Sequence, residues 1–262
     1  MYRCYNLISS EAEAERFMSK NQPIFDLLRV DEEEKRKNAQ TTIYHQLEKW
    51  KKAANLLDGD AMQSEWFPNI DAKIFISHSH KDEELALCLK VIIESFGKVP
   101  VFLDSVVWGY CNDLLKMIDD EFCKNSNNTY SYKMRNNTTA AVHMMLSNAL
   151  TQMMDKCECI LFLNTQNSNM KDCYGKMVET ASPWIYHELS TMKVLRTQVP
   201  KRVLNEQRKV ITMDGMPKIA HKITIGEMPT IELEQLSSWI WEIKSNQLCG
   251  DELLDSLYRS FI

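Results

Sequence analysis

The segment Ser182–Leu189, which reads SPWIYHEL, combines residues that could act on a ligand. Ser182 suits the N-cap of a helix, and Pro183 suits the first helical position. Trp184 and Glu188 are then spaced i and i+4, so an indole and a carboxylate lie on one flank of the helix. A half-buried Trp beside a surface Glu has the same spacing. From spacing alone, this second interpretation is favoured over a ligand-binding pair.

The segment FISHSHKD, residues 75–82, places two serines and two histidines at the end of an apolar run. Ser77, His78, Ser79 and His80 follow one another at the end of this run. A polar turn in which Ser79 or Asp82 caps the next helix would also explain this composition. Two histidines could indicate a metal, but no convergent set of cysteines or carboxylates accompanies them. We therefore expect no metal site.

The segment DSVVWGY, residues 104–110, follows another apolar run. Trp108 and Tyr110 could stack on a planar ring or anchor a protein interface, and they could equally pack down on the domain. The sequence contains no Walker P-loop, GxGxxG, GxSxG or HExxH motif. Phosphoryl transfer through a P-loop, Rossmann-type redox chemistry and α/β-hydrolase chemistry therefore lack their usual sequence support.

The elements that would position these segments alternate between strands and helices. Four short apolar runs predict buried strands, at residues 73–77, 99–103, 159–164 and 209–213. Apolar side chains at helical spacing predict helices between and after them, at residues 83–96, 182–195, 232–245 and 251–260. This order is typical of a doubly wound α/β domain with a mainly parallel sheet. Ligands in such sheets bind outside the carboxyl ends of the strands, where the three segments lie.

The chain divides at about residue 71. Residues 1–70 predict a helical N-terminal extension, in which Ser10 and Glu13 fit a capping box. Residues 71–262 predict the α/β domain, with an insert at about 105–139 whose Asn-rich second half is typical of a loop.

Composition limits the partners and the compartment. The net charge of -5 over 262 residues argues against nucleic acid or an anionic membrane as partner. Apolar runs fall short of the ~20 residues that span a bilayer, and the N-terminal segment turns acidic where a signal peptide would be apolar. We expect a cytoplasmic protein whose eight cysteines are free and mostly buried.

Taken together, these motifs resemble the TIR domain family. KIFISHSHKDEELA resembles the first TIR strand and its loop, VPVFLD the second strand leading into the BB loop, and CILFLNT the third strand. SPWIYHEL is similar to the TIR box S-x-W-x-x-x-E-L. The resemblance covers roughly residues 71–215, and the chain as a whole is similar to the stand-alone TIR proteins of bacterial Thoeris anti-phage systems.

The resemblance implies a flavodoxin-like α/β fold and cleavage of NAD, with Glu188 as the catalytic residue. It implies NAD as substrate with no separate cofactor, a homo-oligomer, and a nucleotide product that reaches a separate effector protein. It also implies that side chains from the strand-exit loops and the TIR box contact the substrate: Ser77, His78, Asp104, Ser105, Trp108, Tyr110 and Trp184.

The chemistry of NAD cleavage fits a single carboxylate. Breaking the bond between nicotinamide and ribose develops oxocarbenium character on the sugar, which a carboxylate such as Glu188 can stabilise. Nicotinamide leaves as a neutral molecule from a cationic ring, so no general acid is needed. An indole at Trp184 could bound the pocket and exclude water, which would favour a cyclic product over hydrolysis.

Two alternatives remain open from the sequence. A non-enzymatic TIR scaffold would self-associate, with Trp108 and Tyr110 as exposed interface anchors. A related N-glycosidic chemistry on nucleosides, such as deoxyribosyl transfer, would use the same carboxylate on a smaller substrate.

Overall fold

The computed structural model describes residues 1–43, 47–52, 56–108, 111–168, 170–171, 177–180, 182–203 and 228–261. The chain forms two compact units. The first unit comprises residues 1–27, 71–103 and 154–262, and the second comprises residues 28–70 and 104–153.

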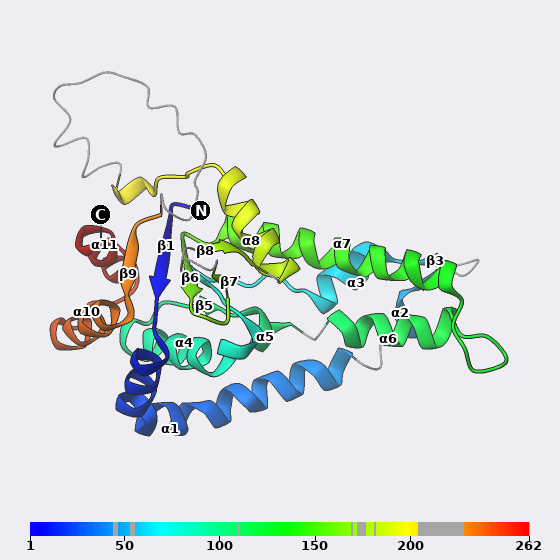
Figure 1. Ribbon diagram of the computed structural model, residues 1–262, viewed down its shortest axis with the longest axis horizontal. Helices are drawn as coiled ribbons and strands as arrows, with labels where there is room; N and C mark the ends of the chain where they lie inside the picture. The colour runs from blue at the N-terminus through cyan, green and yellow to red at the C-terminus, as the bar shows by residue number, and fades with distance from the viewer. Residues whose placement is uncertain are drawn as a thin grey trace, which may run out of the picture. The chain divides into compact units, whose positions relative to one another are not determined.

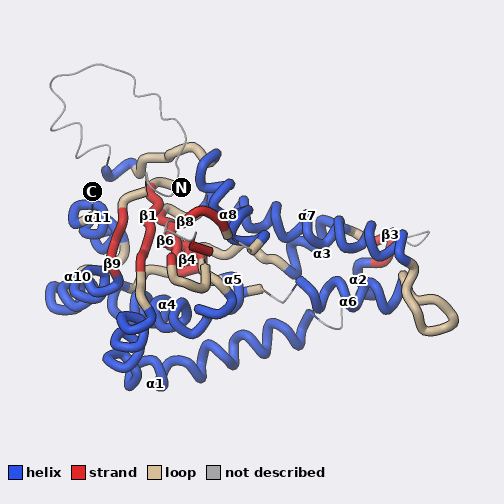
Figure 2. Tube along the Cα trace, viewed as in Figure 1, coloured by secondary structure: helices blue, strands red, loops and turns tan. Residues whose placement is uncertain are grey.

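A five-stranded parallel sheet forms the centre of the first unit (Figures 1 and 2). Its order is β5-β4-β6-β1-β9. The strands are β1 (Arg3–Ile8), β4 (Ile74–Ser77), β5 (Val101–Phe102), β6 (Cys159–Asn164) and β9 (Thr230–Glu232). Every residue of β4 and β6 is buried, as expected for parallel strands that are covered on both faces. Three predicted strands are thus confirmed, and the one at residues 209–213 lies outside the described residues.

The strand order confirms the predicted flavodoxin-like α/β fold. Counted from β4, the sheet follows the order 2-1-3-4-5, with β5 second and β6 third. The fourth place is taken by β1, from the N-terminus of the chain, and the fifth by β9. A ligand site is therefore expected near β4, where the strand order reverses.

The prediction of a helical extension over residues 1–70 is wrong at its N-terminal end. Residues 3–8 form β1, which pairs with β6 along its full length and with β9 at its carboxyl half. The long helix α1 (Glu11–Ile43) follows, and its first residues carry the predicted capping box, in which the Ser10 amide and hydroxyl both donate to Glu13 Oε2 at 2.7 Å. The first 27 residues therefore belong to the sheet unit.

Helices of the first unit agree with the sequence. They are α4 (Glu83–Gly97), α8 (Pro183–Val194), α10 (Leu233–Asn246) and α11 (Asp251–Ser260). Figure 1 shows α10 beside α4, and the rings of Phe96 and Trp241 meet there with centroids 6.2 Å apart.

The second unit is mainly helical. It contains the residues of α1 from Leu28 onward, α2 (Leu47–Trp50), α3 (Gly59–Trp66), α5 (Asp104–Val107), α6 (Cys111–Phe122), most of α7 (Tyr132–Lys156), and the short hairpin of β2 (Lys51–Lys52) and β3 (Leu56–Leu57). The Asn-rich stretch that predicted a loop is a loop only to Ser131, because α7 begins at the next residue. Among the helices described, none combines the length and apolar character needed to cross a bilayer.

Candidate functional site

A buried hydrogen bond joins two of the predicted site residues at the carboxyl end of β4. Ser77 Oγ donates to Glu188 Oε2 at 2.5 Å. Ser77 is 1% exposed and Glu188 is 4% exposed. The two residues are 111 positions apart in the chain, so only the fold brings them together. Their contact lies on the edge of the sheet at which parallel α/β proteins bind ligands.

The local sequence of α8 sets the inward orientation of Glu188. The Ser182 side chain accepts a hydrogen bond from the Ile185 amide at 3.3 Å, and Pro183 occupies the first turn. This cap fixes where the helix begins. The buried face of α8 then consists of Ile185, Glu188, Leu189, Thr191 and Met192. Glu188 thus belongs to the buried stripe, and its interpretation as a surface charge is wrong.

The carboxylate of Glu188 sits where an ionised group is costly unless polar groups surround it. The Ser77 hydroxyl supplies one charge-assisted hydrogen bond and holds the orientation of the carboxylate through Oε2. Because burying a carboxylate costs stability, a buried carboxylate at a strand exit is a stronger indication of function than an exposed one.

Asp82 holds together the two loops that follow β4 and β6. Thr165 Oγ1 donates to Asp82 Oδ2 at 2.6 Å, and Asn167 Nδ2 donates to Asp82 Oδ1 at 2.7 Å. Asp82 occupies the N-cap position of α4, but its side chain makes no capping hydrogen bond. Its predicted role as a helix cap is therefore wrong. The carboxylate instead fixes the loop after β4 against the loop after β6.

We expect Asp82→Ala to lower the free energy of unfolding by about 1–3 kcal/mol, because Thr165 and Asn167 would lose a buried acceptor. Asp71→Ala serves as the control, since the Asp71 side chain is 92% exposed and its removal should change stability by no more than about 0.5 kcal/mol. Urea unfolding followed by circular dichroism measures both. Equal midpoints for the two variants would contradict the bridging role of Asp82.

His78 and Trp184 also lie in the first unit. His78 follows Ser77 directly, and Trp184 precedes Glu188 by one turn of α8. Both side chains are half-buried. Both are close in the chain to the Ser77–Glu188 pair and retain some exposed surface.

The remaining predicted residues belong to the second unit. Asp104 begins α5 and is half-buried, and Ser105 is 6% exposed with no hydrogen-bond partner for its hydroxyl among the described residues. Trp108 is 4% exposed, and its Nε1 donates to the Pro68 carbonyl at 3.0 Å. Its ring meets Phe67 edge-on at 5.3 Å, so Trp108 is a core residue and not an exposed interface anchor. Tyr110 lies outside the described residues.

Sequence reasoning missed a buried amide pair on the same edge of the sheet. Asn164 Nδ2 donates to Asn6 Oδ1 at 2.8 Å, and each residue is 5% exposed. Asn6 Nδ2 in turn donates a hydrogen bond to Thr230 Oγ1 at 3.4 Å. The sequence signal for this pair was an Asn in each of two apolar runs, Asn164 at the end of CILFLN and Asn6 within YNLI. Asn6 could not be placed, because its strand was not recognised.

Burial disfavours nucleophilic chemistry at three of the cysteines that the structure describes. Seven cysteines among the described residues are free, and five of them are buried. Burial raises the pKa of the Cys4, Cys88 and Cys157 thiols to about 12, so they stay protonated at neutral pH and are poor nucleophiles. Within the part of the chain that the structure describes, no group of three or more His, Cys, Asp or Glu side chains is arranged to hold a metal ion.

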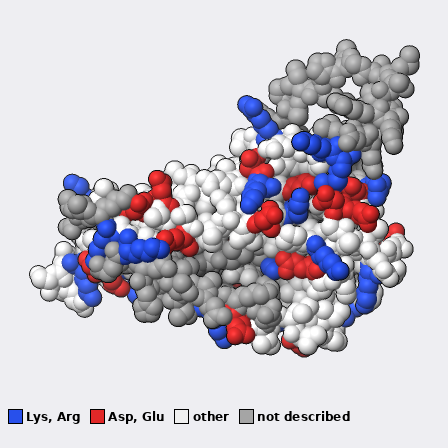
Figure 3. Space-filling model, turned by 180° about the vertical axis from the view of Figure 1, so that it is seen from behind, with Lys and Arg blue, Asp and Glu red and all other residues white. Residues whose placement is uncertain are grey.

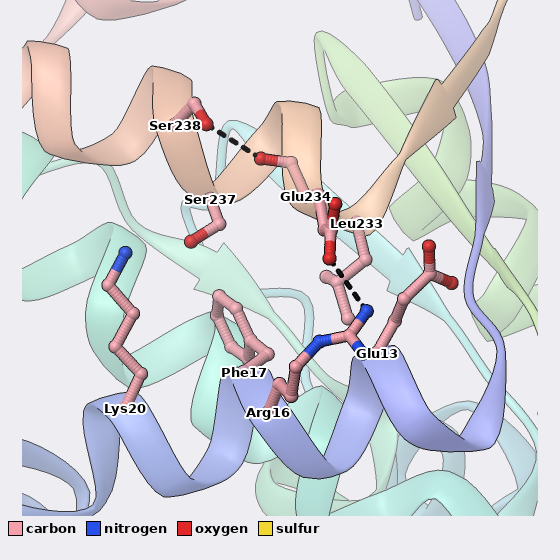
Figure 4. A pocket seen from close by; sticks show the side chains of 8 residues that line it. All are labelled: Glu13, Arg16, Phe17, Lys20, Leu233, Glu234, Ser237 and Ser238. Atoms are coloured by element: carbon pink, nitrogen blue, oxygen red, sulfur yellow. Dashed lines mark hydrogen bonds and ion pairs between the residues drawn. The ribbon is translucent and has the colours of Figure 1, made fainter.

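A separate cavity of about 290 Å³ lies between α1 and α10 (Figure 4). Two residues of its lining form an ion pair, in which Arg16 Nη2 donates to Glu234 Oε1 at 2.7 Å, and their side chains are 64% and 63% exposed. Its charged groups are solvated, in contrast to the buried carboxylate of Glu188. On the face in Figure 3, Lys and Arg side chains lie among Asp and Glu side chains, a mixture unlike the basic stripe of a nucleic-acid-binding protein.

Comparisons of the chain with protein-family models, with curated proteins and with solved structures find no match. The buried Ser77–Glu188 pair, the strand order and the loops tied by Asp82 are therefore the basis for assigning a function.

Proposed function

We propose that this protein is a TIR-type enzyme that cleaves NAD at the bond between nicotinamide and ribose, with Glu188 as the catalytic residue. The observation that carries the proposal is the burial of Glu188 at the carboxyl end of β4 and its hydrogen bond from Ser77. A surface glutamate on a capped helix would not need such a partner.

Each residue of the site has a separate part in this chemistry. The carboxylate of Glu188 stabilises the positive charge that develops on the ribose as nicotinamide departs. Ser77 holds that carboxylate in place, so little reorganisation is needed when the charge appears. Trp184, one turn earlier on α8, forms a wall of the nicotinamide pocket and limits the entry of water. His78 contributes to the opening of the site beside Ser77.

The biological setting that goes with this proposal is bacterial anti-phage defence. The product would be ADP-ribose, a cyclic isomer or a conjugate, and it would act as a nucleotide signal on a separate effector protein. Assembly into a homo-oligomer belongs to the same proposal, as does a location in the cytoplasm.

The test is NAD consumption by the purified full chain, with the products identified by mass spectrometry. We expect loss of NAD and release of nicotinamide with the wild type but not with Glu188→Ala. The mass of the second product then separates hydrolysis, cyclisation and conjugation. Absence of NAD loss from folded wild-type protein, with and without extract from phage-infected cells, would refute the enzymatic proposal.

The scaffold hypothesis and the nucleoside chemistry both predict no loss of NAD in this assay. The scaffold hypothesis loses one of its two anchors, because Trp108 is buried in the second unit. Turnover of deoxynucleosides without loss of NAD would instead favour the nucleoside chemistry.

A further inference from the structure

Four adjacent strands carry one row of side chains across the sheet of the first unit. Ser77 of β4 is in register with Phe162 of β6, which is in register with Asn6 of β1, and Asn6 is in register with Thr230 of β9. Residues in register on neighbouring strands point to the same face of a sheet, and so do residues two apart on one strand. Asn164, two residues after Phe162, therefore shares this face, in agreement with its hydrogen bond to Asn6.

This face is the one on which Glu188 lies, because Ser77 belongs to the row and donates to Glu188. The row thus begins at Ser77, the hydrogen-bond partner of the candidate catalytic carboxylate, and reaches the amide pair at Asn6. Figure 1 shows β1, the strand that carries Asn6, inside the sheet between β6 and β9.

The amide pair is unusual for its position. Strands of a parallel sheet that are buried on both faces are normally continuous runs of apolar residues. Asn6 and Asn164 are each 5% exposed, at positions where Leu or Val would give stability without any need for hydrogen bonds. A purely structural role would be to set the register between β1 and β6. Their position on the carboxyl side of the sheet, on the same face as Ser77, fits ligand binding better.

Distance along the row indicates the size of the ligand. Neighbouring strands lie about 4.8 Å apart, so Asn6, two strands from Ser77, is roughly 10 Å away from it. A nucleoside held with its glycosidic bond at Glu188 would not extend across two strand spacings. A dinucleotide would, and its second ribose offers hydroxyl groups that side-chain amides bind as both donor and acceptor.

We propose that Asn6 and Asn164 bind the second ribose of a dinucleotide substrate whose scissile bond lies at Glu188, and so select dinucleotides over mononucleotides. This inference rests on the proposed function. It assigns to the N-terminal strand a part of the binding site, whereas the sequence motifs place the site wholly after residue 71.

The experiment compares NAD with nicotinamide mononucleotide as substrates of the full-length protein. The variant Asn6→Leu/Asn164→Leu changes both amides together, so neither is left without its partner in the core. We expect kcat/KM for NAD to fall about ten- to hundredfold, mainly through KM, because hydrogen bonds to the substrate are lost. Turnover of the mononucleotide should stay at the wild-type value. Ser77→Ala is the matched control, and it should slow both substrates by the same factor.

A second variant covers the case in which the double variant does not fold. Asn6→Asp retains an oxygen that accepts from Asn164 Nδ2, but it removes the amide donor and adds a negative charge that repels a pyrophosphate. It should also raise KM for NAD selectively. Equal effects on both substrates, or no effect on either, with an unchanged melting temperature would overturn the inference while leaving NAD cleavage intact.

Failure of the proposed function itself gives a different result. If the wild type does not cleave NAD, calorimetric titration with ADP-ribose decides the inference. Binding by the wild type and its loss in Asn6→Asp would support the amide pair as a nucleotide site. Absence of binding to the wild type would overturn it.

Discussion

Glu188→Gln is expected to lower kcat for NAD cleavage by about 10²- to 10³-fold, the size of effect seen when one preorganised electrostatic group is removed from a transition state. The amide has the shape of the carboxylate but no charge, so it cannot stabilise the developing oxocarbenium ion. Its oxygen still accepts the hydrogen bond from Ser77, so the fold and the KM should change little. Initial rates of nicotinamide release, measured over a range of NAD concentrations, give both constants.

Glu84→Gln is the matched control for this experiment. Glu84 is an exposed residue in the first turn of α4, and neutralising it changes the net charge by the same amount. Its kcat should equal that of the wild type. If Glu188→Gln retained full activity, the carboxylate would not be the catalytic group, and the buried pair with Ser77 would have to be explained as a structural contact.

Removal of residues 1–9 is expected to abolish cooperative folding of the first unit. The deletion takes out β1, which is in register with all six residues of β6 and with all three of β9. It would leave the inner edge of β6 without its ladder of hydrogen bonds and would separate β9 from the sheet. Urea unfolding of the truncated chain should therefore lack the transition of the full-length protein.

Two point variants in β1 test the same conclusion without truncation. Leu7 is 0% exposed and its neighbour Ile8 is 40% exposed. Leu7→Ala should cost about 2–5 kcal/mol of unfolding free energy, as buried Leu truncations do. Ile8→Ala should cost about 1 kcal/mol or less. A cooperative transition from the chain that lacks residues 1–9, or equal losses for the two variants, would show that the N-terminal strand is dispensable.

The parts of this protein that could be predicted are those with short-range signals. The strands at β4 and β6 follow from apolar runs bounded by polar residues, and α4 follows from the spacing of its apolar side chains. The start of α8 follows from Ser182 and Pro183, whose capping roles depend on the next three residues only. Cap and spacing also put Trp184 and Glu188 one turn apart. These signals were enough for the fold class, whereas Glu188 became the candidate carboxylate through the resemblance of its segment to the TIR box.

Burial of individual side chains was less predictable. From the sequence, Trp108 could be an exposed anchor or could pack down on the domain, and it lies in the core of the second unit against Phe67. Asp82 stands where a helix cap is expected, yet its carboxylate accepts from Thr165 and Asn167. In both cases the deciding partners lie far along the chain, and a local pattern carries no information about them.

By itself, the sequence determined the parallel α/β class, the capped helix α8 and the presence of Glu188 next to a strand exit. Only the tertiary structure decided that residues 3–8 form a central strand, that Ser77 bonds Glu188, and that Asn6 pairs with Asn164. The physical reason is the same for all three. A short strand has little conformational preference of its own and is stabilised by its hydrogen-bonded neighbours, and for β1 the neighbour β6 lies more than 150 residues away in the chain. Side chains on different elements meet only after the sheet has set the register of its strands.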